Sequence, residues 1–225
     1  MSGPHLGSPG TGGPRLVLAT HNRHKLGELL AILSPLVPGL APGGIVSSAD
    51  VGGPEPVEDG VTFAENALIK ARAVATRTGL PAVADDSGLC VDVLGGAPGV
   101  FSARWSGRHG DDRANLELLL AQLIDVPAAH RGAQFTCAAA LVTPDGVEDV
   151  VTGTMRGVLT TAARGAGGFG YDPVLEPDLQ PARALAAGVR LTSAELSPEE
   201  KNAISHRGQA LRALAPVVAA RLAGR

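Results

Sequence analysis

The chain has 225 residues, of which 44% are hydrophobic, 18% charged and only 3% aromatic, and its formal net charge is −3. This length and composition predict a globular protein with an aliphatic core, and the charge argues against general nucleic-acid binding, which needs excess Lys and Arg to displace counterions. Two cysteines are too few for a disulfide framework, and neither a signal peptide nor an apolar membrane span is evident, so we expect a cytoplasmic protein that binds no membrane.

The N-terminal part of the chain begins with a stretch rich in Gly, Pro and Ser. It predicts a disordered extension over residues 1–14, followed by a single domain over residues 15–225. An apolar strand is expected over 16–19. The next helix repeats leucines at helical spacing and should end at Ser34-Pro35, and a short strand is expected at 45–46.

The middle of the chain alternates helices and strands. Thr62, with Glu65 three residues later, forms a capping-box pattern that predicts a helix stopped by Gly79. An apolar strand over 81–84 should end in Asp85-Asp86-Ser87-Gly88. A second strand over 89–93 and a helix from about Asp111 complete this part.

The last part of the chain opens with a hairpin. Strands over 133–143 and 147–154 are joined by Pro144-Asp145-Gly146, and a short strand is expected at 158–160. One helix should begin after Ser197 and the last should run over 208–222. This order predicts an α/β fold with a mixed sheet and two lobes around a cleft.

Thr20, Asn22 and Lys25 lie between the first strand and the first helix. Backbone N–H groups at a helix start bind anions, phosphates above all, and Lys25 would add a positive charge. The structural alternative is that Asn22 only caps the helix and Lys25 is solvated.

Asp85 and Asp86 are adjacent acids at the predicted end of an apolar strand, where they are costly unless a cation meets them. Neighbouring side chains on a strand point opposite ways, so one acid would face the cleft and the other would brace a loop or helix start. Magnesium, held by carboxylate, water and phosphate oxygens, suits this position. An Asx turn before Ser87 is the structural alternative.

Charged residues around the second helix form a third group. Glu65, Lys70 and the acidic region before Thr62 could supply another metal carboxylate and a cation for phosphate. The alternatives are that Glu65 serves only as a cap and that Lys70 is an ordinary surface lysine.

Residues 167–173 form a glycine-rich loop that contains Phe169 and Tyr171, two of the few aromatic residues. Glycines let a backbone approach a ligand closely, an aromatic face stacks on a purine, and Asp172 could accept from a base. A flexible loop with a packed Phe is the alternative. Gly165-x-Gly167-x-x-Gly170 also matches the dinucleotide fingerprint, but no helix follows it, so we reject that match.

Lys201, His206 and Arg207 form a compact cluster before the last helix. An Arg fork grips a phosphate or an exocyclic oxygen, and a neutral His donates or accepts at a base edge. A charged helix junction is the alternative. Together, the groups supply a phosphate cradle, a metal carboxylate, a stacking loop and a base-edge cluster, which describes a nucleotide site.

These segments, in this order, resemble the inosine triphosphate pyrophosphatase family, the non-canonical purine nucleoside-triphosphate pyrophosphatases. The matching runs span residues 18–211: LATHNRHKLGEL, GVTFAENALIKARA, VADDSGLCVDVLGGAPGVFSARWSG, GGFGYDP and AELSPEEKNAISHRGQAL. The resemblance implies an elongated mixed sheet with flanking helices, two lobes around a nucleotide-binding cleft, and a homodimer. It implies an Mg²⁺-dependent enzyme that hydrolyses ITP, dITP and XTP to the nucleoside monophosphate and pyrophosphate, which cleanses the nucleotide pool.

The resemblance also implies roles for individual residues. Asp86 would be the catalytic proton acceptor and a metal ligand, Glu58 would be the second metal ligand, and Ser87 would contact substrate. Lys70 is a further candidate for substrate binding. The other expected substrate contacts are Thr20, His21, Asn22, Arg23, His24, Lys25, Phe169, Gly170, Tyr171, Asp172, Lys201, His206 and Arg207.

The chain departs from the family pattern at a few places. His21 stands where glycine is common, Asp59 replaces a threonine, and residues 178–191 form a longer segment than usual. Three other functions stay open: a Maf-type pyrophosphatase acting on pyrimidine or modified nucleotides, a nucleotide sensor without hydrolysis, and a nucleic-acid-binding domain.

Overall fold

A computed structural model describes residues 13–20, 23–37 and 43–223, and it leaves the side chains of residues 23–25 undescribed. The predicted extension over residues 1–14 therefore lies outside the described residues except for its last two. No helix within the described ranges is long and apolar enough to span a membrane.

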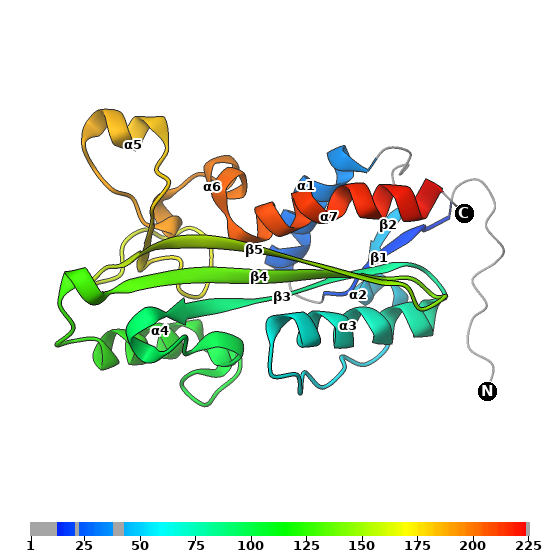
Figure 1. Cartoon of the computed structure of the whole chain (residues 1–225), viewed down its shortest axis with the longest axis horizontal. Coiled ribbons are helices and arrows are strands. Elements are labelled where there is room, and N and C mark those ends of the chain that lie inside the picture. The colour runs from blue at the N-terminus through cyan, green and yellow to red at the C-terminus, as the bar shows by residue number, and fades with distance from the viewer. Residues whose placement is uncertain (1–12, 21–22, 38–42, 224–225) are drawn as a thin grey trace.

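Six strands form one open, mixed sheet in the order β2-β1-β3-β4-β5-β6. β1 is parallel to β2 and β3, whereas β3 through β6 pair antiparallel. The long strands β3, β4 and β5 run through both halves of the molecule (Figure 1), which confirms the predicted elongated mixed sheet. The strands are β1 (Leu16–Leu18), β2 (Ile45–Ser47), β3 (Ala82–Val91), β4 (Gly132–Val142), β5 (Glu148–Leu159) and β6 (Leu175–Pro177).

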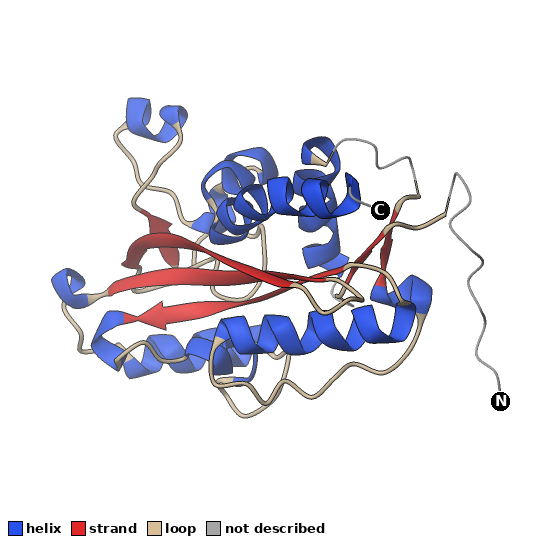
Figure 2. Ribbon diagram, turned by 45° about the vertical axis from the view of Figure 1, so that its right-hand side comes forward, coloured by secondary structure: helices blue, strands red, loops and turns tan. Residues whose placement is uncertain are grey.

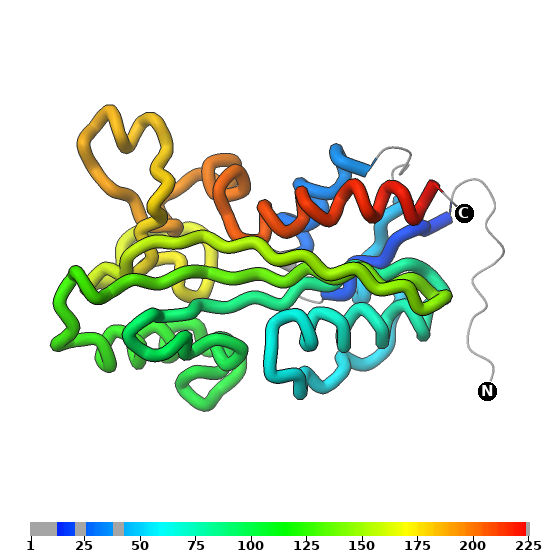
Figure 3. Tube along the Cα trace, in the orientation of Figure 1, coloured from blue at the N-terminus to red at the C-terminus, as the bar shows by residue number. Residues whose placement is uncertain are grey.

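Helices cover both faces of this sheet (Figure 2). α1 and α7 lie side by side on one face although they come from opposite ends of the chain (Figure 3), and α3 covers the other face. The helices are α1 (Arg23–Leu36), α2 (Ser48–Val51), α3 (Phe63–Thr78), α4 (Asp112–Gln122), α5 (Ala182–Ala187), α6 (Pro198–Ile204) and α7 (His206–Ala223).

The alternation of side chains along the strands divides the core between these layers. Leu16 and Leu18 pack with α1 and α7, whereas Val17 between them packs with the small residues Ala67 and Ala71 of α3. A third cluster lies under α4, where Leu119 and other apolar residues meet the far ends of β3, β4 and β5. The helices on the two faces are therefore held by separate sets of residues from the same strands.

Strand β3 differs from the prediction because it runs unbroken from Ala82 to Val91. The expected strand end at Asp85 is wrong, and so is the Asx turn that was the structural alternative. β4 pairs with every residue of β3, from Ala82 opposite Val142 to Val91 opposite Ala133. The polar residues 85–87 therefore remain within the paired strand. The two acids therefore lie in the middle of a strand and not at its end.

Three other boundaries also differ from the prediction. α1 continues to Leu36. Pro35 lies in its last turn, so the proline does not end the helix before this point. β5 extends to Leu159 and absorbs the short strand that was expected separately, while α7 begins at His206 and not at Gly208. The capping box of Thr62 and Glu65, the hairpin and the Ser197 cap are confirmed.

The relative lengths of β1 and β3 open a cleft beside the sheet. β1 pairs with β3 only at Ala82 and Val83, and no other described strand pairs with β3 on that side next to Asp85 and Asp86. The chain that leaves β1 turns into α1 at this point. In open α/β sheets, ligands bind in the crevice outside the carboxyl ends of the strands, and β1 ends at this point.

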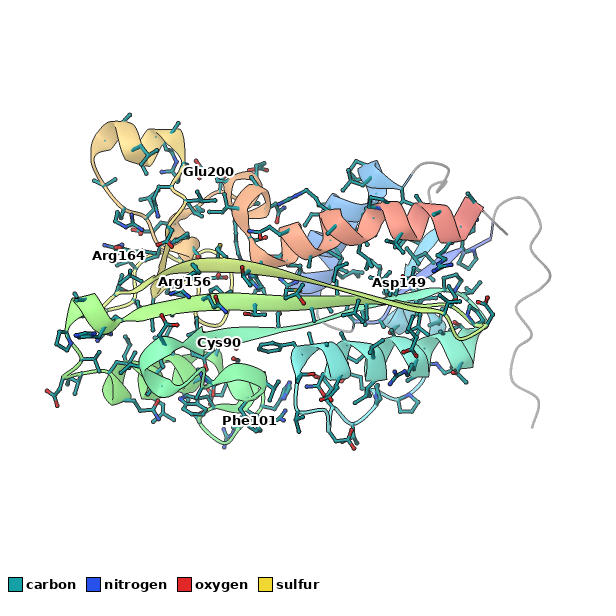
Figure 4. The ribbon with its side chains drawn as sticks, in the orientation of Figure 1. Cys90, Phe101, Asp149, Arg156, Arg164 and Glu200 are labelled. Carbon is teal, nitrogen blue, oxygen red and sulfur yellow. The ribbon has the colours of Figure 1, made fainter. Side chains whose placement is uncertain are left out.

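The segment over residues 178–191, which is longer than usual, contains α5, which projects from the body (Figure 1). Arg183 of α5 donates twice to Glu200 of α6, at 2.8 Å in both cases, and Glu200 lies between these two helices (Figure 4). The guanidinium lowers the pKa of the Glu200 carboxyl to about 2. The projection is therefore tied to the helix that carries Lys201.

Candidate active site

A cleft of about 350 Å³ lies where β3 leaves β1. Its wall comes from the middle of β3, from α3, α6 and α7, from the start of α4, and from residues 169–172. This volume is within the range of small-molecule sites. The cleft therefore joins segments that are far apart in the sequence.

Asp86 faces the α3 side of the sheet and is 8% exposed. Its Oδ1 lies 3.2 Å from Lys70 Nζ, and its Oδ2 accepts from Asn66 Nδ2 at 3.3 Å. The same Lys70 nitrogen lies 3.3 Å from Glu58 Oε1. Asn66 in turn accepts from the backbone N–H of Gly60, so the loop before α3 is tied to the site.

The ammonium of Lys70 stands between two carboxylates. Burial disfavours its charge, but Asp86, Asp85 and Glu58 together more than offset this effect and raise the pKa of Lys70 above its ordinary value. Lys70 is therefore positively charged at neutral pH, and it is not an ordinary surface lysine.

Asp85 and Ser87 face the α7 side of β3. Arg207, which is 2% exposed, donates from Nε to Asp85 Oδ2 at 3.1 Å and from Nη2 to Ser87 Oγ at 3.0 Å. Its Nη1 donates to Glu28 of α1. Burial opposes the charge of Arg207, but Asp85 and Glu28 outweigh burial and keep its pKa raised. As the sequence predicted, one acid braces a helix start, here that of α7, although both acids line the cleft.

Residues 167–172, called the base loop below, are fixed by a buried ion pair. Asp172 is 3% exposed, and its Oδ2 accepts from Lys201 Nζ at 2.8 Å and from the Phe169 N–H at 2.8 Å. Burial raises the pKa of Asp172, and Lys201 partly offsets this rise. Lys201 also donates to Glu28 at 3.4 Å. This carboxyl oxygen of Asp172 therefore shapes the loop.

Aromatic rings and cations alternate along the same side of the cleft. Lys201 Nζ lies 5.2 Å and the Arg207 guanidinium carbon 5.7 Å from the centre of the half-buried Phe169 ring. His206 stacks on Phe135 of β4 with ring centres 5.0 Å apart. Tyr171 is buried, its hydroxyl donates to the backbone oxygen of Ser102 at 2.9 Å, and burial raises its pKa.

The predicted phosphate cradle is described only in part. Thr20 lines the cleft, and α1 begins at Arg23, so a helix start does follow β1 as expected. His21 and Asn22 lie outside the described residues, and so do the side chains of Arg23, His24 and Lys25.

The sequence did not single out Glu28 or Asn66. Glu28 accepts hydrogen bonds from Arg207 and Lys201, and Asn66 donates to Asp86. Glu28 falls within the first family-like run, but an acid on an amphipathic helix is usually solvated, so nothing in the pattern singled it out. Glu65, in contrast, accepts from the backbone N–H of Val61 and Thr62 and serves as a cap.

Carboxylates are the oxygen donors that a hard cation prefers, and two face each other across Lys70. Asp86 and Glu58 lie within 3.3 Å of the same nitrogen, so this position accepts positive charge. Within the described ranges no group of three or more His, Cys, Asp or Glu residues is placed to hold a metal ion. Any ion here would take its remaining ligands from water or from a bound ligand.

The sequence matches a known protein family and several curated proteins. The model of the Ham1 family matches residues 16–217. The chain is 63% identical over 204 residues to a dITP/XTP pyrophosphatase of Streptomyces avermitilis, covering 91% of this chain and 96% of that protein. It is 56% identical over 206 residues to a dITP/XTP pyrophosphatase of Leifsonia xyli, covering 92% and 96%.

Solved structures with the same fold include relatives of moderate identity. A nucleoside-triphosphatase, or dITP/XTP pyrophosphatase, from Mycobacterium abscessus is 51% identical, with a TM-score of 0.69 over 90% of this chain and 99% of that one. A HAM1 protein from Coxiella burnetii is 39% identical, with a TM-score of 0.76 over 91% and 98%.

Proposed function

Because the chain belongs to the Ham1 family, we propose that it hydrolyses the non-canonical purine nucleotides ITP, dITP and XTP to the nucleoside monophosphate and pyrophosphate. The observation that supports this most directly is the middle of β3. It presents Asp86 to Lys70 on one face and Asp85 with Ser87 to Arg207 on the other, within one cleft that also contains Phe169.

The residues around Asp86 suit attack by water on the α-phosphorus. Asp86 takes the proton of the attacking water as the new P–O bond forms. The bond from the α-phosphorus to the bridging oxygen then breaks, and pyrophosphate leaves with that electron pair. Lys70, which is charged and faces Asp86, is placed to neutralise phosphate charge, and the start of α1 beside Thr20 adds N–H donors.

The base loop suits a purine that carries an oxygen at position 6. The cations Lys201 and Arg207 lie within 6 Å of Phe169, so a ring resting on Phe169 meets donors and positive charge. A 6-oxo purine offers an acceptor there, whereas adenine offers an amino donor. Adenine offers these cations no acceptor at that position and forgoes the hydrogen bond, which disfavours ATP.

Magnesium is the divalent ion that we propose for this site. Asp86 and Glu58 are the residues that would hold it, since their carboxylates already share a cation in Lys70. When bound, the ion supplies neutralisation of charge on the triphosphate. If these carboxylates held the ion, Lys70, which now contacts both, would be able to contact the substrate phosphates.

The resemblance also supports two wider parts of the proposal, a single two-lobed domain over residues 15–225 and a homodimer. We propose a cytoplasmic location as well, because the sequence has neither a signal-peptide pattern nor an apolar membrane span. We propose further that the protein binds neither nucleic acid nor membrane, in keeping with its net charge of −3. Light scattering during size exclusion would show a mass of two chains if the homodimer is correct.

A panel of triphosphates tests the proposed function. The purified chain is given ITP, dITP, XTP, GTP, ATP, UTP and CTP with Mg²⁺ or with EDTA, and the products are separated by chromatography. We expect monophosphate and pyrophosphate from the first three, at least about 10²-fold slower turnover of ATP, and no turnover in EDTA. Preference for UTP or CTP would favour a Maf-type enzyme, and tight binding of ITP without product would favour a sensor.

A further inference from the structure

The base loop turns sharply at two glycines and is held by contacts from several elements. Gly168 and Gly170 adopt the left-handed conformation, with φ of +72° and +59°, which gives the loop two sharp changes of direction within three residues. On one side the loop is anchored by the buried pair of Asp172 and Lys201. The N–H of the peptide between Phe169 and Gly170 has a separate partner outside the loop.

That partner is Asp112, the first residue of α4. Its Oδ2 accepts from the Gly170 N–H at 2.9 Å, although 58 residues separate the two in sequence. Asp112 lines the cleft, and the start of a helix stabilises a negative charge. Its neighbour Asp111 has a different task, since it caps α4 by accepting from the Ala114 N–H at 3.1 Å.

The contact joins the two sides of the cleft through the loop that carries Phe169. α6 holds the loop through Lys201, whereas α4 holds the next peptide through Asp112. The Lys201 pair is buried and the Asp112 contact is exposed, so loss of Asp112 leaves the buried anchor in place. Such a loss would free the orientation of the Phe169 ring and leave Asp86 and Lys70 untouched.

We infer that Asp112 is a positioning residue for nucleobase recognition, because its carboxylate holds the Gly170 amide and thereby orients Phe169 towards the base. The inference rests on the proposed function and deepens it. It assigns to α4 a part in substrate binding, separate from the reacting atoms on β3.

Steady-state kinetics with ITP separate binding from chemistry. Asp112→Ala should raise KM on the order of five- to tenfold, as expected for one lost hydrogen bond, and leave kcat within about twofold of the wild type. Asp112→Asn keeps an acceptor oxygen and should recover most of the affinity. An unchanged KM, or a loss confined to kcat, would overturn the inference.

Two variants on the same helix serve as controls. Asp111→Ala removes the cap of α4 but not the contact with the base loop, and Glu117→Ala removes an exposed pair with Arg113. Both should keep the wild-type KM. If Asp111→Ala raised KM as much as Asp112→Ala, the effect would come from general loosening of α4 and the inference would be wrong.

Hydrogen exchange provides a readout that does not depend on activity. The Gly170 amide should exchange faster in Asp112→Ala than in the wild type, and at the wild-type rate in Glu117→Ala. Unchanged exchange in Asp112→Ala would contradict the assigned contact. A wild-type chain that does not hydrolyse ITP would overturn the proposed function and with it this role, whereas an active wild type with an unaltered Asp112→Ala variant would overturn the inference alone.

Discussion

Asp85 and Asp86 are neighbours in the chain, yet each carboxylate meets a different cation on a different face of the sheet. Asp85 meets Arg207 of α7, and Asp86 meets Lys70 of α3. The reason is the alternation of side chains along a strand. Placing both acids within one strand lets a single segment bring carboxylates to two cations on opposite faces of the sheet within one cleft.

Asp86→Asn keeps the shape of the side chain but cannot accept a proton from water. We expect turnover of ITP to fall by about 10²- to 10⁴-fold, the usual contribution of a positioned base, with the fold intact. Pyrophosphate release measures the loss. Asp92→Asn, on an exposed acid just beyond the same strand, should keep full activity, and near-normal turnover by Asp86→Asn would refute the role of Asp86.

Lys201→Met leaves the buried Asp172 without its cation. Breaking a buried pair in this way should cost about 3–5 kcal/mol in the free energy of unfolding, measured with urea. Arg113→Met, on an exposed pair, is the control and should cost no more than about 1 kcal/mol.

The cost of Lys201→Met should depend on pH. Burial already raises the pKa of Asp172, and removal of Lys201 raises it further. When the pKa of a carboxyl is higher in the folded protein than its ordinary value of 3.8, the folded protein loses stability as the pH rises from that ordinary value through the folded-state pKa. The difference in unfolding free energy from the wild type should therefore be larger at about pH 8 than at about pH 5. A difference independent of pH would contradict this account.

At the scale of elements, the position of α7 depends on a close approach to β5. A side chain at Gly153 would meet the backbone oxygen of His206 and the backbone nitrogen of Ala210. Only the absence of a side chain allows the helix to cross the strand there. The same helix carries His206 and Arg207, so the strand determines where these residues enter the cleft.

Gly153→Ala should push α7 away from the sheet. Overpacking of this kind costs about 1–3 kcal/mol of unfolding free energy, and turnover of ITP should fall because Arg207 is displaced from Asp85 and Ser87. Thr154→Ala, at the next and exposed position, is the matched control for both measurements. A Gly153→Ala variant as stable and active as the control would show that the helix can adapt.

At the scale of the whole molecule, the cleft exists only when distant segments are folded together. Its wall joins β3, α3, the base loop and α7. A ligand that binds this assembly and not the unfolded chain must stabilise the fold.

ITP should therefore raise the melting temperature of the Asp86→Asn variant, which binds without rapid turnover. At 100 times its Kd, a ligand adds about 2.7 kcal/mol, which corresponds to roughly 5–10 °C for a chain of this size. ATP at the same concentration should give a much smaller shift. Equal shifts with both nucleotides would contradict recognition of the base through the 6-position.

Local chemistry made several elements predictable from the sequence alone. The capping box of Thr62 and Glu65, the Ser197 cap and the Pro144-Asp145-Gly146 hairpin depend on residues that are close in the chain. Periodicity placed α1, α3 and α4. The runs that carry the family resemblance lie between residues 18 and 211, so family and function were also readable from residue types in order.

Pairing between distant segments decided the rest. β3 is one strand because β4 supplies a partner for every residue from Ala82 to Val91, which no local pattern around Asp85 reveals. Glu28 contacts Arg207 and Asp112 contacts the base loop only because α1 and α4 begin close to them, and on each helix these acids look like ordinary solvated residues. Hydrogen bonds and charges between side chains act over a few ångströms in space, whatever the separation in sequence, so only the tertiary structure could assign these partners.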